Sequence, residues 1–554
     1  MGSRILRITD LGVLVLIVIC AGIIVFACGT RGFFAFDQSI VFDGAYRVYQ
    51  GQTVYKDFVI PVGPITFWLQ ALFFSFGGVS YRSYVAHAAV GNCLASVCVF
   101  FLLRRLYPTA KIWPALGSLL TALYFYPPFG TPWLEQTAFL FVLVGLLIII
   151  LPALDPQKPR YFAAFGAGVC AALAFLSKQN AGLFSMPMLL ALLMFRRLTS
   201  GNSLWKGCLA FFMGLSATTL AFLTWLWIWS DFRLFWKHVF TIPSGEGLRR
   251  LSGDMYHTVV TLTLSDGPFA DRLGFVCGSV ASGLFFLLCL WNLRRDPRMW
   301  TADATACFLA LGALLTQNSF ILSTKYQPEN GYPFLGIILA VGGASLWKML
   351  HFQMAIAFQG IALQLPSPKL VRGFFLLGFA GLTAWIGAVG FRSAWSRSVH
   401  DLFEGADFSQ RCQVPILGEI KWSSPTSKLG QQLTTAQLEA IVAYLQKKEE
   451  RFVVFTDYTI LYAMLRQPSP QPLLWFHKGL TYPQTYDPQI DRWIADSLAA
   501  NEVQTALVEE NAWWGDARKT LEEDFPLVKQ FLLENFVQHD PIGPFRIYER
   551  IPTK

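Results

Sequence analysis

Three carboxylates follow the first long apolar run of this 554-residue chain. The run covers residues 11–28, and Asp37, Asp43 and Asp57 come soon after it. A carboxylate at a membrane surface can accept a proton as a general base, bind a metal ion or simply remain hydrated. A substrate carried on a lipid presents its head group at the same depth, so these residues could act on it.

The surroundings of Asp37 favour a chemical role. Phe33, Phe34 and Phe36 flank it and place it at the apolar boundary of the membrane. Desolvation there would raise the proton affinity of the carboxylate unless a cation or an acceptor offset the cost. A residue that only keeps a loop soluble would seldom occupy such a position.

Two further charged residues stand at the ends of later apolar runs. Glu135 precedes one run, where it could be a second acid or a metal ligand, or could interact with a helix N-terminus. Lys178 follows another run and precedes Gln179. Its ammonium could bind a phosphate together with Gln179, or its stem could snorkel along the membrane.

Other cations on the same predicted side could line a phosphate site. Arg249, Arg250 and Lys325 are such candidates, although solvated polar turns explain them at least as readily. Asp57 could take part in binding, or could orient Lys56 and the loop backbone. The loops carry no Asp-x-Asp pair and the histidines are scattered, so a divalent metal stays open without specific support.

The composition predicts the elements that must hold these residues. The chain is 54% hydrophobic and only 14% charged, which is typical of a polytopic α-helical membrane protein. Eleven apolar runs read as spans: 11–28, 83–103, 112–128, 136–153, 160–176, 182–195, 207–229, 273–292, 303–321, 333–350 and 373–391. The net charge is +9, but the basic residues form no stripe interleaved with stacking aromatics. Nucleic acid is therefore not an expected partner.

Alternate connections carry compact basic clusters, which the positive-inside rule places in the cytoplasm. Examples are Arg4 with Arg7, and Arg104 with Arg105. The N-terminus is therefore predicted to be cytoplasmic, and the first loop and everything after about 392 to face outward. The expected location is the cell's inner (plasma) membrane. Two apolar stretches, 64–78 and 351–370, are predicted to lie along the membrane interface without crossing it.

The composition changes near residue 392, which predicts two domains: a transmembrane domain over 1–391 and an extracytoplasmic, periplasmic α/β domain over 392–554. The alternating patterns in the second domain predict helices at 437–450, 491–501 and 525–535, and strands at 451–456, 503–509 and 545–550.

The first loop resembles that of a known family. The residues that carry the resemblance are Phe36-Asp37-Gln38, Gly51-Gln52, Val54-Tyr55-Lys56-Asp57-Phe58 and Pro61-Val62-Gly63-Pro64, with a weaker match at Leu176-Ser-Lys-Gln-Asn-Ala-Gly182. They are similar to GT-C glycosyltransferases, in the bacterial branch that resembles protein mannosyltransferases and lipid A aminoarabinose transferases. The spacing from Asp37 to Gly51 fits that pattern. Gln38 departs from it, because the family commonly has an acid there.

The resemblance implies a GT-C-like transmembrane domain and assigns the catalytic position to Asp37. It implies inverting transfer of a sugar from a polyprenyl-phosphate donor to a hydroxyl of a glycan, lipid or protein acceptor. Two alternatives stay open. One is a transporter or flippase of a lipid-linked saccharide. The other is an inactive relative that only binds glycan or lipid, which the departure at Gln38 suggests.

Overall fold

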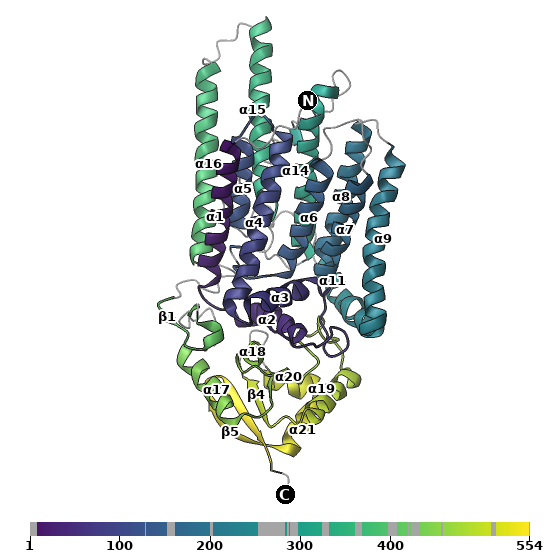
Figure 1. Ribbon diagram of the computed structural model, residues 1–554, viewed down its shortest axis with the longest axis vertical. Helices are drawn as coiled ribbons and strands as arrows, with labels where there is room; N and C mark the ends of the chain where they lie inside the picture. The colour runs from purple at the N-terminus through teal and green to yellow at the C-terminus, as the bar shows by residue number, and fades with distance from the viewer. Residues whose placement is uncertain are drawn as a thin grey trace.

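The computed structural model describes most of the chain. The described residues are 8–127, 129–151, 161–199, 203–252, 283–284, 287, 297–323, 332–360, 368–396, 407–418, 420–422, 433–455, 458–510 and 517–552. A bundle of long helices forms one part, and a small sheet with helices forms the other (Figure 1).

The long helices of the bundle coincide with ten of the eleven predicted apolar runs. They are α1 (Ile8–Gly29), α4 (Tyr81–Leu106), α5 (Ile112–Tyr124), α6 (Leu134–Ile150), α7 (Tyr161–Ser177), α8 (Gln179–Thr199), α9 (Leu204–Trp229), α14 (Pro297–Ser323), α15 (Leu335–Gly360) and α16 (Pro368–Ser396). The run predicted at 273–292 lies almost entirely outside the described residues.

Within the described part of the chain, four helical segments are both long and apolar enough to cross a membrane: Asp10–Gly29, Tyr81–Leu106, Gln179–Leu198 and Leu204–Trp229. Six shorter apolar helices accompany them, among them Ile65–Gly77 and Leu134–Ile150. The total of eleven spans stays a prediction.

Two short helices separate the bundle from the sheet (Figure 1). They are α2 (Ala35–Tyr49) and α3 (Ile65–Gly77), and both lie across the direction of the long helices. The prediction of an interfacial stretch at 64–78 agrees with the position of α3. Helix α2 was not predicted, because its polar and apolar residues alternate too irregularly to give a clear helical stripe. We call the end of the bundle beside α2 and α3 the sheet end.

The interfacial stretch predicted at 351–370 is wrong in its first half. Helix α15 continues without a break to Gly360, and in Figure 1 α15 and α16 extend beyond the other helices on the side away from the sheet. The three glutamines at 353, 359 and 364 suggested a separate element. Glutamine is nevertheless a good helix former, so polarity alone does not end a helix.

The C-terminal sheet has four strands in the order β3-β4-β6-β5. They are β3 (Phe452–Phe455), β4 (Thr505–Glu509), β5 (Phe536–Ile542) and β6 (Phe545–Arg550), with β3 and β4 parallel and the other pairs antiparallel. The predicted strands are β3, β4 and β6. Strand β5 was missed because it is a mostly exposed edge strand without an apolar alternation.

The predicted helices of this region are also present, as α17 (Thr435–Lys448), α19 (Pro488–Ala500) and α21 (Pro526–Asn535). The remaining short elements are α10 (Phe232–Trp236), the π-helix η2 (Lys237–Thr241), α11 (Ile242–Ser252), β1 (Gln410–Arg411), the 3-10 helix η4 (Pro415–Leu417), β2 (Lys421–Trp422), α18 (Leu461–Met464) and α20 (Ala517–Asp524).

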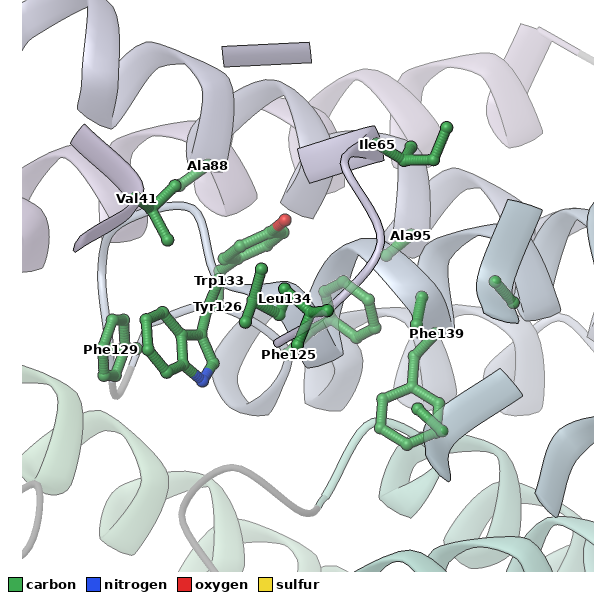
Figure 2. Packing of buried hydrophobic residues seen from close by; sticks show 14 of the residues in the cluster. Val41, Ile65, Ala88, Ala95, Phe125, Tyr126, Phe129, Trp133, Leu134 and Phe139 are labelled. Carbon is green, nitrogen blue, oxygen red and sulfur yellow. The ribbon is translucent and has the colours of Figure 1, made fainter. Parts of the chain in front are cut away.

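Buried aromatic residues hold the start of α6 in place at the sheet end. The rings of Phe129 and Trp133, just before α6, lie 5.0 Å apart, and Figure 2 shows them side by side. One turn into α6, Phe139 packs edge-on against Phe320 and Phe334. This packing fixes where the first turn of α6 presents its side chains.

Candidate functional site

Asp37 lies in the first turn of α2 and is half-buried. Helix N-termini carry partial positive charge, which favours a carboxylate there, and Arg47 in the last turn has the matching sign at the other end. The carboxylate to which the resemblance assigns catalysis is therefore held on a helix at the sheet end of the bundle and remains partly accessible.

Gln38, the departure from the family pattern, joins α2 to the bundle. Its side chain accepts from the Phe34 amide at 2.9 Å and from the Tyr81 hydroxyl at 3.3 Å, and donates to the Phe129 carbonyl at 3.4 Å. Its side chain is buried. An amide can donate and accept at once, which an ionised acid cannot do. The structure therefore gives Gln38 a role in holding α2.

The same contacts bring α2 next to the beginning of α6. The Tyr84 hydroxyl of α4 donates to the Gln38 carbonyl at 3.1 Å and lies 3.5 Å from the Pro132 carbonyl. Pro132 is three residues before Glu135, which stands in the first turn of α6. The helices that carry Asp37 and Glu135 are thus held to a common tyrosine.

Glu135 and Lys178, proposed separately from the sequence, form an ion pair. Lys178 Nζ lies 3.2 Å from Glu135 Oε1, and the side chains are 22% and 5% exposed. The second carboxylate oxygen of Glu135 is buried without a hydrogen-bond partner in the described structure. The lysine has three donor hydrogens, and its partial exposure leaves room for an additional anion.

Gln179 connects the Lys178 segment to two other loops. Its side-chain amide donates to the Pro61 carbonyl at 2.8 Å and to the Val239 carbonyl at 3.1 Å. Gly63 lies so close to the Leu176 carbonyl that an added Cβ would be 1.8 Å from its oxygen. The two segments that carried the family resemblance, far apart in sequence, therefore pack directly against each other.

Asp57 lies in an exposed turn of the first loop. Its carboxylate accepts from the Thr53 amide at 2.6 Å. Tyr55 between them has a φ of 61°, a left-handed conformation that is uncommon for a residue with a Cβ. The contact stabilises the turn, as the alternative reading of Asp57 expected, and its role in substrate binding stays a prediction.

The remaining predicted cations are only partly described. Arg249 and Arg250 lie on α11, and their side chains are outside the described part. Lys325 lies outside the described residues. Among the residues that the structure describes, no group of three or more His, Cys, Asp or Glu side chains is arranged to hold a metal ion.

Sequence reasoning missed a second ion pair, between Asp43 and Arg47 of α2. Arg47 Nε lies 2.9 Å from Asp43 Oδ2, and both side chains are fully buried. Burial raises the pKa of the Asp43 carboxyl to about 6, although the Arg47 charge and hydrogen bond oppose the shift. The i, i+4 spacing of opposite charges was the available signal, but it is informative only once α2 is known to be a helix.

Comparisons with known proteins identify the fold. The family model of dolichyl-phosphate-mannose-protein mannosyltransferases matches residues 61–227. Among solved structures, ArnT from Cupriavidus metallidurans bound to undecaprenyl phosphate is similar, with 16% identity, a TM-score of 0.56 and 98% of each chain covered. The chain has the GT-C fold of this ArnT. It is accordingly a multi-pass membrane protein with a sheet-containing C-terminal region.

Two further solved structures are less similar to this chain. The apo form of the same ArnT is 15% identical, with a TM-score of 0.46 and 98% of each chain covered. The arabinofuranosyltransferase AftD from Mycobacteria is 12% identical, with a TM-score of 0.47, and the match covers 98% of this chain but 40% of AftD. Among curated proteins, none matches the sequence.

Proposed function

We propose that this GT-C protein is an integral membrane glycosyltransferase. It takes a sugar from a polyprenyl-phosphate donor and transfers it, with inversion, to an acceptor hydroxyl at the outer face of the membrane. The observation that carries the proposal is the Glu135–Lys178 ion pair, which lies against the two segments similar to glycosyltransferases. The family match over 61–227 includes both Glu135 and Lys178.

In the proposed reaction Asp37 accepts the proton of the acceptor hydroxyl. The hydroxyl oxygen attacks the anomeric carbon of the donor sugar from the face opposite the phosphate. The bond between that carbon and the phosphate oxygen breaks, and the phosphate keeps the electron pair. A general base of this kind contributes roughly 10²- to 10⁴-fold to a rate.

Lys178 is proposed to bind the phosphate on which negative charge collects. Its ammonium offers donors beyond the one directed at Glu135, and Glu135 holds the lysine in position. Fixed donors aimed at developing charge typically supply about 3–4 kcal/mol to catalysis. Gln179, Arg249, Arg250, Lys325 and Asp57 are proposed to complete the donor site.

The proposed location follows the charge pattern of the sequence. The chain would lie in the inner or plasma membrane with a cytoplasmic N-terminus, and residues 392–554 would form the extracytoplasmic domain. The ArnT structure that shares the fold was solved with undecaprenyl phosphate, which supports a polyprenyl-phosphate lipid as the carrier here. The acceptor is proposed to be a glycan, a lipid or a protein.

The test is sugar transfer from a panel of radiolabelled polyprenyl-phosphate sugars in membranes that contain equal amounts of wild-type protein or Asp37→Asn. We expect transfer by the wild type and a loss of at least about 10²-fold in the variant, because an amide cannot accept the proton. Equal rates would remove Asp37 from the mechanism. Absence of transfer with every donor would favour a flippase or a binding protein.

A further inference from the structure

Helix α2 is held at its two ends by two different parts of the molecule. Near its N-terminus, Gln38 bonds to Tyr81 of α4 and to the Phe129 carbonyl before α6. Near its C-terminus, Arg47 donates through Nη1 to the carbonyl of Gln471 in the C-terminal region, at 2.7 Å. Asp37 therefore stands on a helix whose position depends on both parts.

The contact around Arg47 is closed to solvent. Its guanidinium bonds to Asp43 and lies 5.3 Å from the ring centre of Phe58 and 5.9 Å from that of Tyr462. All of these side chains are buried. The planar guanidinium thus meets a carboxylate, a carbonyl and two rings in one fixed orientation, which a lysine ammonium could not reproduce.

A continuous set of bonds leads from Arg47 to the sheet. The side-chain amide of Gln471 donates to the Val454 carbonyl of β3 at 3.0 Å. The Val454 amide in turn donates to the Tyr462 hydroxyl at 2.9 Å. Arg47 is therefore connected to β3 through Gln471 and through Tyr462, whose ring its guanidinium faces.

This arrangement is costly compared with an apolar contact. Asp43 Oδ1, Arg47 Nη2 and Gln471 Oε1 are buried and have no hydrogen-bond partner within the described structure. Replacement of a buried ion pair by apolar residues of similar volume is often neutral or stabilising by about 1–4 kcal/mol. Stability alone therefore does not account for the pair, whereas a single enforced geometry of α2 does.

We propose that Arg47 is a positioning residue of the transfer reaction. By fixing α2 to the C-terminal domain it sets the position of Asp37, ten residues or about 15 Å away along the same helix. The C-terminal domain would then be part of the catalytic apparatus, beyond any role as a cover. The effect of Arg47 on the rate of transfer rests on the proposed function, whereas its effect on the position of α2 does not.

The experiment uses the full-length protein in membranes or detergent and compares Arg47→Lys with the double variant Asp43→Leu/Arg47→Met. Lys237→Met is the matched control, because Lys237 forms another ion pair with the C-terminal domain, 2.7 Å from Asp487, but from η2 and not from α2. Each protein is measured for kcat and donor KM, and for hydrogen exchange of the peptide that covers residues 35–49.

We expect Arg47→Lys to lower kcat about tenfold or more with donor KM within twofold, and to speed exchange along α2 as far as its first turn. The double variant is expected to unfold no more easily than the wild type and yet to remain slow, because it lacks the bond to Gln471. Lys237→Met should keep the wild-type kcat and the wild-type exchange of α2.

A wild-type kcat in the double variant would overturn the proposal. So would an Arg47→Lys variant with unchanged kcat in which faster exchange is confined to residues after 43. Exchange of the β3 and β4 peptides reports whether the C-terminal domain stays folded in each variant. The exchange arm does not depend on turnover. If the wild type transfers no sugar, the proposed function fails, while the exchange data still decide whether Arg47 positions the first turn of α2.

Discussion

The two ion pairs of the sheet end have similar chemistry and different surroundings. Asp43–Arg47 has no exposed side-chain surface, whereas Lys178 in the Glu135–Lys178 pair is 22% exposed. The guanidinium of the closed pair is already engaged with a carboxylate, a carbonyl and two rings. The ammonium of the open pair retains donors for another anion. Access to solvent, more than charge, separates a structural pair from a candidate binding pair.

The largest effect on stability is expected at the closed pair. Arg47→Met leaves the Asp43 carboxylate buried without its partner, which typically costs about 3–5 kcal/mol. We expect a lower thermal midpoint for detergent-solubilised Arg47→Met, measured by tryptophan fluorescence. A midpoint equal to that of the wild type would show that water reaches the pair, and would remove the distinction between the two pairs.

The open pair should matter more for transfer than for folding. Lys178→Met is expected to lower kcat/KM about 10²- to 10³-fold, because the phosphate loses a fixed cation. Glu135→Gln keeps a hydrogen-bonding side chain beside the lysine, so we expect a smaller loss of about tenfold. The measurement is donor-dependent transfer at matched protein levels. Similar losses in both variants would mean that Glu135 contacts the substrate itself.

The smallest effect is a pH dependence of stability at another contact with the C-terminal region. His238 of η2 is buried and its Nδ1 lies 3.2 Å from the Thr481 carbonyl. Burial, and then the nearby Lys237 charge, lowers the pKa of His238 to about 4. The neutral ring therefore contributes stability that is complete above about pH 6.5 and is lost as the pH falls toward 4.

Asp43 opposes this trend. Because the pKa of its carboxyl is raised in the folded protein, its contribution to folding stability is lost as the pH rises from about 3.8 to 6. The test is therefore a difference between wild type and His238→Gln in thermal midpoint at pH 7.5 and pH 5. We expect the wild type to lose stability relative to the variant at pH 5. A constant difference across that range would show that His238 is protonated without penalty.

Much of the fold followed from the sequence because lipid imposes simple rules on it. A span must be long, apolar and helical, so ten apolar runs such as 207–229 could be recognised as helices without any contact information. The strands β3, β4 and β6 were also predictable, because buried strands are rich in branched and aromatic residues. Helix α2 and strand β5 were not, since neighbouring parts of the fold stabilise them despite weak local patterns.

Residue types and positions in the sequence were enough to select Asp37, Glu135 and Lys178 as candidates. Their relation to one another was not readable, because 43 residues separate Glu135 from Lys178 and only the packing of α6 against α7 and α8 places them 3.2 Å apart. The family resemblance pointed to the first loop. Tertiary structure decided that this loop contains helix α2 and that Gln38 and Arg47 hold the two ends of the helix. It also decided that one ion pair is closed to solvent and the other open, because burial depends on the whole fold and not on local sequence.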